Sequence, residues 1–177
     1  MQIYDLLKSD HESLKGLLNE LTSMTGKGDP HELVDKIRDA FVPHSRAEEA
    51  VFYNSLRAFD EAKSKIMHSF NEHLSAETML RTIQMKEKVA GDWKKTAKEL
   101  KTAIEHHVAE EEGEIFTLAR RFFSDDESEA MGRAFSKMKE EVVGEGLMKT
   151  SLDLITNLMP PRFTDRFREF HSPKRAG

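Results

Sequence analysis

Two ten-residue stretches of the chain share a pattern that strongly limits how the chain can fold. Residues 44–53 read HSRAEEAVFY and residues 107–116 read HVAEEEGEIF, so each begins with His-x-x-x-Glu-Glu and continues into apolar or aromatic residues. A histidine and a glutamate four residues apart lie on the same face of an α-helix, one turn from each other. In both stretches this face is also the apolar face, which predicts that polar side chains point into a helical core.

Apolar residues recur at helical spacing along most of the chain. Gly and Pro are scarce and charged residues make up 33% of the sequence, a composition typical of an all-α protein. Breaks such as the TGKGDP stretch at residues 25–30 separate the helices, and short connections favour antiparallel neighbours. We therefore expect an up-down-up-down four-helix bundle, with one helix before residue 25 and others over about 31–59, 61–89 and 93–123.

The chain after the fourth helix is interpreted as an extension. Ser124 followed by Glu127 matches a capping box, which predicts a fifth helix over about 125–143. The tail is basic and aromatic, and it is interpreted either as a short helix packing on the bundle or as a contact site for a partner. We expect a metal-binding bundle over residues 1–124, a C-terminal helical extension over 125–159 and the tail over 160–177.

Length and composition exclude several classes of function. A chain of 177 residues suits one domain, and a formal net charge of −5 argues against nucleic acid as a partner. The sequence holds no cysteine, which excludes disulfides, iron–sulfur clusters and thiol catalysis. It shows neither a signal-peptide pattern nor an apolar run long enough to span a membrane. We expect a cytoplasmic protein with no membrane partner.

Histidines interrupt the apolar stripe of each bundle helix, and three of these helices add a glutamate one turn later. His11 and His73 lie 62 residues apart, and His44 and His107 lie 63 apart, so the chain reads as two copies of a helix pair. Folded as a bundle, the copies would face each other around a pseudo-twofold axis. The candidate metal ligands are His11, His44, Glu48, His73, Glu77, His107 and Glu111.

Burying these groups without a counter-charge would be strongly unfavourable, since each buried ion costs several kcal/mol. Two cations offset the charge, and seven groups are too many for one first-row ion, so we expect a dinuclear centre bridged by Glu48 and Glu111. Mixed imidazole and carboxylate ligation suits iron first, then manganese or zinc. Glu77 has three interpretations: a direct ligand, a holder of water, or a partner of a ligating histidine.

A single His-x-x-x-Glu pair would more simply be a surface ion pair, and only the repetition on apolar stripes favours the metal site. Glu49 and Glu112 fall off the stripe and are interpreted as solvated or as partners of the ligands. Tyr4 and Tyr53 are near the site in sequence, but their hydroxyls cannot be placed. Four other histidines are interpreted as ordinary surface residues: His31, His68, His106 and His171.

At these residues the chain resembles the hemerythrin-like, or HHE cation-binding, family. The resemblance covers about residues 3–123, with SDH at 9–11, HSRAEE at 44–49, NEH at 71–73 and HVAEEE at 107–112. It implies a four-helix bundle around a non-haem di-iron centre bridged by an oxo or hydroxo group. The ligands it implies are His11, His44, Glu48, His73, His107 and Glu111.

The resemblance also carries one departure. Oxygen-carrying members have a fifth histidine one turn after the one that matches His73, where this chain has Glu77. A third carboxylate favours higher oxidation states, which argues against simple reversible carriage of O2. Family members of this sort are associated with iron or oxygen sensing, with nitric oxide or peroxide handling, and with stress responses.

Three functional hypotheses follow. The first is a cytoplasmic di-iron protein that binds iron and O2, NO or H2O2 in sensing, storage or stress response, with a protein partner or a homodimer formed through the C-terminal segment. The second is a di-iron oxidase or peroxide-degrading enzyme, and the third is a metal-free helical interaction module. Whether the protein is an enzyme is left open, and no Ser-His-Asp or P-loop pattern suggests another chemistry.

Overall fold

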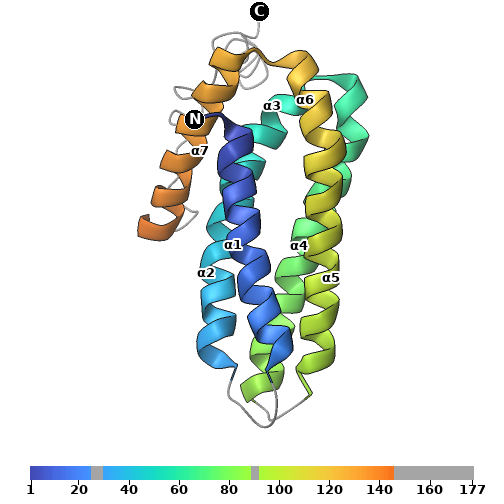
Figure 1. Ribbon diagram of the computed structural model, residues 1–177, viewed down its shortest axis with the longest axis vertical. Helices are drawn as coiled ribbons and strands as arrows, with labels where there is room; N and C mark the ends of the chain where they lie inside the picture. The colour runs from blue at the N-terminus through green and yellow to red at the C-terminus, as the bar shows by residue number, and fades with distance from the viewer. Residues whose placement is uncertain (25–29, 89–91, 146–177) are drawn as a thin grey trace, which may run out of the picture.

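Four long helices form the body of the protein (Figure 1). The computed structural model describes residues 1–24, 30–88 and 92–145, and these contain no β-strand. The chain runs down one helix and up the next, so the predicted all-α, up-down-up-down bundle is confirmed. The four helices are α1 (Ile3–Ser23), α2 (His31–Glu48), α4 (Asp60–Lys88) and α5 (Lys94–Glu110).

Two of the predicted helices are interrupted by a wider turn. After α2 the chain passes through a π-helical segment, η1 (Glu49–Tyr53), into α3 (Asn54–Leu56). After α5 it passes through η2 (Glu111–Ile115) into α6 (Phe116–Phe122). Such turns hold an extra residue without ending the helix, and they occur often at functional sites. The apolar stripes alone predicted continuous helices here, because a single wider turn barely disturbs their spacing.

The fifth helix, α7 (Asp125–Glu145), begins at the predicted capping box. The backbone N–H and the hydroxyl of Ser124 donate hydrogen bonds to Glu127 Oε2, at 2.8 and 2.9 Å. In return the Glu127 backbone N–H donates to Ser124 Oγ at 3.3 Å. This reciprocal pairing satisfies donors that the first turn of a helix would otherwise leave free, so the helix starts where the sequence indicates.

Helix α7 packs along α1 and α2 rather than standing apart (Figure 1). Gly132 lies so close to the N-terminus that an added Cβ would come 2.6 Å from the carbonyl oxygen of Met1. The side chains of Met131, Ala134, Phe135 and Met138 are buried in the same apolar cluster as residues of the bundle. The rest of the predicted extension, residues 146–159, and the tail at 160–177 lie outside the described residues.

The interior is divided into two apolar clusters. One, which includes Leu7 and Phe52, lies toward the end where α3, α6 and the start of α7 gather. The other, which includes Leu14 and Ile37, fills the opposite half of the bundle. On α1 the histidine at position 11 falls between Leu7 and Leu14, so a polar layer separates the clusters. Within the described residues, no helix has the length and apolar character that crossing a bilayer requires.

Candidate metal centre

Each helix of the bundle contributes one buried histidine to this polar layer. The imidazole rings approach in two pairs, His11 with His44 at 5.1 Å and His73 with His107 at 4.6 Å between ring centroids. None of the four residues is more than 6% exposed. The structure therefore brings together the four histidines that the sequence placed on four separate stripes.

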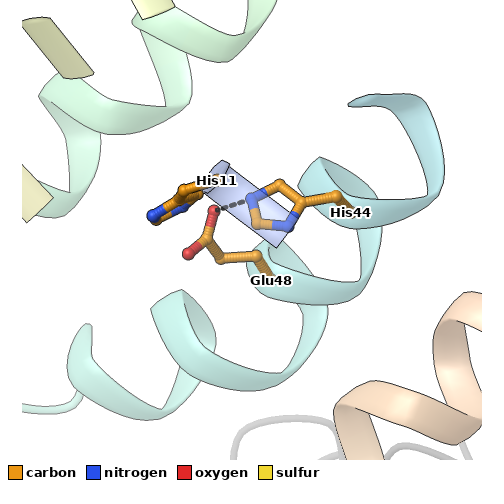
Figure 2. Close-up of side chains that lie close together, drawn as sticks. All are labelled: His11, His44 and Glu48. Carbon is orange, nitrogen blue, oxygen red and sulfur yellow. Dashed lines mark ion pairs between the residues drawn. The ribbon is translucent and has the colours of Figure 1, made fainter. Parts of the chain in front are cut away.

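Glu48 lies between the two histidine pairs. Its Oε2 is 3.5 Å from Nε2 of His44 and 3.4 Å from Nε2 of His73. The ligand atoms of His11, His44 and Glu48 all lie within 4.8 Å of one another, and those of Glu48, His73 and His107 do likewise. Figure 2 shows the first group, with its three side chains turned toward one another. Glu48 is thus common to two potential cation positions.

Glu111 joins the pairs from the opposite side. Its Oε2 lies 3.2 Å from Nε2 of His11 and 4.0 Å from Nε2 of His107. Both Glu48 and Glu111 are fully buried, and each stands at the start of one of the π-helical turns. The two carboxylates therefore occupy equivalent places in the two copies of the helix pair, as the repeat predicted.

Each of the four histidines also has a carboxylate on its outer nitrogen, Nδ1. A carboxylate only accepts hydrogen bonds, so Nδ1 carries a proton and Nε2 is the nitrogen that faces inward. This is the arrangement that orients histidine ligands in metal sites. The four contacts are His11–Glu112 at 2.8 Å, His44–Asp10 at 3.0 Å, His73–Glu49 at 3.0 Å and His107–Glu72 at 2.9 Å.

These outer carboxylates form a closed ring around the bundle. Helix α1 supplies Asp10 to the histidine of α2, the π-turn after α2 supplies Glu49 to α4, α4 supplies Glu72 to α5, and the π-turn after α5 supplies Glu112 to α1. The sequence analysis left Glu49 and Glu112 as solvated or as partners of ligands, and it did not single out Asp10 and Glu72. The sequence signal for Asp10 and Glu72 was their position: in both copies of the helix pair, an acidic residue stands directly before the histidine.

Several inward atoms of the centre have no hydrogen-bond partner in the described part of the chain, whereas Nε2 of His73 and Nε2 of His107 face each other at 3.1 Å. Nε2 of His11, both carboxylate oxygens of Glu48 and both of Glu111 are buried and have no hydrogen-bond partner among the described residues. Leaving such atoms unsatisfied is costly, and leaving two buried carboxylates unsatisfied is more so. Cations held among them would satisfy both the lone pairs and the charge, so the donor set fits a metal centre.

Comparison with known proteins agrees with this geometry. The sequence profile of the hemerythrin HHE cation-binding domain matches residues 2–119. The chain belongs to the hemerythrin HHE cation-binding family. The predicted resemblance is thereby confirmed, and the family is one of cation-binding domains.

A more distant relative is a protein named DNA nickase from Nostoc sp. (strain PCC 7120 / SAG 25.82 / UTEX 2576). It is 24% identical over 142 residues, which cover 80% of this chain and 40% of the relative. The matched region of this hemerythrin-family chain thus spans only about two fifths of the relative's length. No solved structure matches the chain.

The two carboxylates of the hemerythrin-family centre differ in electrostatic environment. Burial and the neighbouring charge of Glu48 raise the pKa of Glu111 well above its usual value. Burial would also raise the pKa of Glu48, but the close approach of Glu111, His44 and His73 outweighs it and lowers that pKa well below its usual value. Without metal, the pair is therefore expected to share a proton, as close carboxylates do.

The histidines of the centre also differ from one another in pKa. Burial, reinforced by the charge of His44, lowers the pKa of His11 to about 4. Burial alone would lower the pKa of His73 too, but its hydrogen bonds with Glu48 and Glu49 raise it to about 9. Without metal, a proton on His73 takes part of the role that a cation would have.

Glu77, the third candidate carboxylate, is not in either ligand group. Its Oε2 accepts a hydrogen bond from Arg46 at 2.5 Å, and its Oε1 accepts one from Arg81 at 2.6 Å. Arg46 also contacts Glu49 Oε2 at 3.5 Å, and Glu49 is the outer partner of His73. The carboxylate at position 77 is therefore held by two guanidinium groups behind the outer ring.

Tyr53 borders the centre from the η1 turn. Its ring stacks on that of His73 with 5.5 Å between centroids, and the residue is fully buried. Its hydroxyl has no hydrogen-bond partner in the described part of the chain. Burial and the charges of Glu111 and Glu48 raise the pKa of Tyr53, so the phenol stays protonated and can donate. The sequence analysis could not place this hydroxyl.

Helix α7 reaches the centre from outside. Lys139 Nζ donates to Asp10 Oδ2 at 2.5 Å, and the same oxygen accepts from Nδ1 of His44. Phe135 contacts the His44 ring edge-on, with 5.8 Å between centroids. The residue behind one ligand is therefore fixed by a helix that lies beyond the residues of the family match. No sequence signal pointed to Lys139.

Proposed function

We propose that this protein is a cytoplasmic non-haem di-iron protein that binds iron and a small ligand, O2, NO or H2O2, in sensing, storage or stress response. The observation that carries the proposal is the pair of three-residue groups that share Glu48, in which Nε2 of His11 and both oxygens of Glu48 lack a hydrogen-bond partner among the described residues. Two groups with one common carboxylate favour two ions over one. A set of imidazoles and carboxylates without thiolates suits iron, with manganese or zinc as alternatives.

The ligands of the proposed centre would be His11, His44, Glu48, His73, His107 and Glu111. When bound, the two ions would supply redox-active positions at which O2, NO or peroxide is recognised. The outer carboxylates hold the rings so that Nε2 points inward in each case. The apolar clusters on either side of the layer exclude bulk water from the site.

Glu77 has a different role in this proposal. Both of its oxygens are already paired with arginines, and these contacts favour a positioning role over direct ligation. Through Arg46 it steadies Glu49 and so the orientation of His73. This role differs from the third interpretation of Glu77 from the sequence, in which Glu77 itself would accept a hydrogen bond from a ligating histidine, because Glu49 holds that place on His73.

The test is metal analysis of protein produced in iron-supplemented cells. We expect about two iron ions per chain, as in other bundles that hold di-iron carboxylate centres, and an absorption spectrum that changes with O2, NO or peroxide. Glu111→Gln should lower the iron content while the helical circular dichroism spectrum is kept. Protein that contains no iron would contradict the proposal. So would iron-loaded protein whose absorption spectrum does not change with O2, NO or peroxide.

A second candidate, a di-iron oxidase or peroxide-degrading enzyme, is favoured by one observation. The unpartnered hydroxyl of Tyr53 is buried beside the two carboxylates, where it can donate a proton to a ligand held in the centre. Steady turnover of peroxide or ferrous iron, lost in Tyr53→Phe while iron is retained, would support this candidate. A single stoichiometric reaction without turnover would count against it.

The third hypothesis, a metal-free interaction module, finds no support in the centre, because five buried polar atoms of its ligands would stay unsatisfied. Contact with a protein partner or a homodimer through the C-terminal segment stays part of the first proposal. DNA nicking is stated of the Nostoc relative alone. The net charge of −5 disfavours binding to a phosphate backbone, so we do not include DNA in the proposal.

A further inference from the structure

A second cluster of histidine and glutamate lies on the outside of the bundle, where α4 and α5 run side by side in opposite directions. Each helix carries one His-x-x-x-Glu pair there, His68 with Glu72 on α4 and His106 with Glu110 on α5. Because the helices are antiparallel, the pairs meet head to tail, and each histidine faces both glutamates. This repeats on the surface the motif that builds the buried centre.

The distances in this cluster match those around a bound metal ion. His68 Nε2 lies 3.5 Å from Glu72 Oε1 and 3.6 Å from Glu110 Oε2. His106 lies 3.3 Å from Glu72 Oε1 through Nδ1 and 3.6 Å from Glu110 Oε1 through Nε2. Ligands at about 2.0–2.2 Å from a tetrahedral ion are separated by about 3.3–3.6 Å. One ligand atom each of His68, Glu72 and Glu110 lies within 4.8 Å of the others, so these three residues could hold one ion. His106 meets the two glutamates through different ring nitrogens, so only one of its two contacts could become a ligand to that ion.

The charge of the cluster also favours a cation. In the described part of the chain, the ion pairs of Glu72 and Glu110 involve only histidines. The nearby Lys65 pairs with Glu114 instead. Neither carboxylate therefore has a lysine or arginine as its ion-pair partner in that part of the chain, and isolated surface pairs of this kind contribute little to stability.

The surface cluster is open to solvent, and one of its residues also contacts the buried centre. The side chains of His68 and His106 are 58% and 61% exposed, and an open groove between α4 and α5 is lined in part by Glu72 and His106. Glu72 is shared: its Oε1 faces the surface histidines and its Oε2 accepts from Nδ1 of His107 at 2.9 Å. A single carboxylate therefore separates this cluster from a ligand of the buried centre.

We propose that His68, Glu72 and Glu110, with His106 beside them, form a second, solvent-exposed site for a divalent transition-metal ion, on the outer side of His107. Mixed imidazole and carboxylate ligands suit Zn²⁺, Fe²⁺ or Mn²⁺, whereas Ca²⁺ and Mg²⁺ prefer oxygen ligands alone. The site does not depend on which metal fills the buried centre. It interprets His68 and His106 differently from the sequence analysis, which took them as ordinary surface residues.

The test is equilibrium dialysis of tag-free protein against Zn²⁺, both as isolated and after its metal has been removed with a chelator. The double variant His68→Ala/His106→Ala should bind one Zn²⁺ fewer per chain than the unaltered protein in both states. Glu110→Gln should weaken the extra ion by more than about tenfold, since even groups behind a ligand are worth about 10- to 100-fold. Because these side chains are exposed, the helical circular dichroism spectrum should not change.

His31→Ala is the matched control. His31 is equally exposed, at 58%, and faces Asp35 one turn later at 3.6 Å, but Asp35 also pairs with Arg38 at 2.6 Å. Zn²⁺ binding should be unchanged in this variant. Equal numbers of bound Zn²⁺ in the unaltered protein and the double variant would overturn the proposal. Loss of the buried metals from both proteins alike would instead bear on the di-iron function.

Discussion

At the scale of single residues, the centre is defined by the two ends of each imidazole. One nitrogen faces a carboxylate of the neighbouring helix, and the other faces the interior, where polar atoms lack partners. The outer contact decides which nitrogen is free, so it controls metal binding without touching the metal. Three predictions belong to this scale.

The first concerns the outer ring of carboxylates. Glu112→Gln keeps the size of the side chain but removes the charge behind His11, which it contacts at 2.8 Å. We expect metal affinity to fall by about 10- to 100-fold, measured by competition with a chelator. Glu12→Gln is the control, since Glu12 is 73% exposed and pairs only with Lys15 among the described contacts. Equal losses in both variants would argue against an orienting role.

The second concerns pH. The pKa of His73 is raised from 6.5 to about 9 in the metal-free protein, so its protonated form contributes stability that is complete below about 6.5 and is lost as pH rises through 9. The pKa of His11, at about 4, leaves that ring neutral throughout this window. Urea denaturation of metal-free protein should show the free energy of unfolding falling between pH 7 and 9. His73→Gln should flatten this fall, and an unchanged slope would refute the assignment.

The third concerns Glu77. Because its oxygens are bound by Arg46 and Arg81, Glu77→Ala should retain the full metal content. Its effect on affinity should be below the roughly tenfold that marks a carboxylate touching a ligand. Metal analysis and chelator competition check both statements. Loss of one metal ion per chain would restore the interpretation of Glu77 as a direct ligand.

At the scale of elements, two features decide how the ligands are presented. Glu48 directly precedes η1 and Glu111 is the first residue of η2, so each of these two carboxylates sits at a local change in helical pitch. Helix α7 closes the outside of α1 and α2, placing Lys139 on Asp10 and Phe135 on His44. The close approach of α7 to the N-terminus can be tested directly.

Gly132→Ala should destabilise the protein. Its added methyl group would lie 2.6 Å from the carbonyl oxygen of Met1, and overpacking of this kind costs about 1–3 kcal/mol, partly offset by a gain in helix propensity. Gly16→Ala on α1, with nothing within 4 Å of the added Cβ, should instead stabilise by about 0.5–1 kcal/mol. Urea denaturation compares the two. Equal stabilisation would mean that α7 does not pack this closely.

At the scale of the whole molecule, the bundle consists of two apolar clusters joined through a polar layer. Without cations, that layer contains two fully buried carboxylates whose oxygens have no hydrogen-bond partner in the described residues. Metal binding and folding are therefore expected to be coupled, because the cations bind the folded arrangement and not the unfolded chain.

Removing the metal should accordingly lower the melting temperature. An ion present at a thousand times its dissociation constant stabilises the folded state by about 4 kcal/mol. Thermal unfolding followed by circular dichroism, with and without a chelator, measures the difference, and adding the metal back should reverse it. An equal melting temperature with and without the chelator would show that the polar layer is stable without cations.

The sequence alone determined the fold class, and it predicted the main candidate ligands. The apolar stripes fixed which face of each helix points inward, and the histidines and glutamates on those stripes had to follow, because period and burial are local properties of a helix. The pseudo-repeat then predicted that the two copies face each other. The capping box at Ser124 likewise predicted the start of α7, since it involves residues only three apart.

Only the tertiary structure decided the pairings between helices. Which carboxylate lies behind which imidazole depends on the rotation and register of neighbouring helices, and these are set by packing across the whole core. The same holds for the arginines on Glu77, the lysine of α7 on Asp10, and the meeting of His68 with Glu110. A residue's own helix determines whether it faces inward, but its partner is determined by a helix elsewhere in the chain.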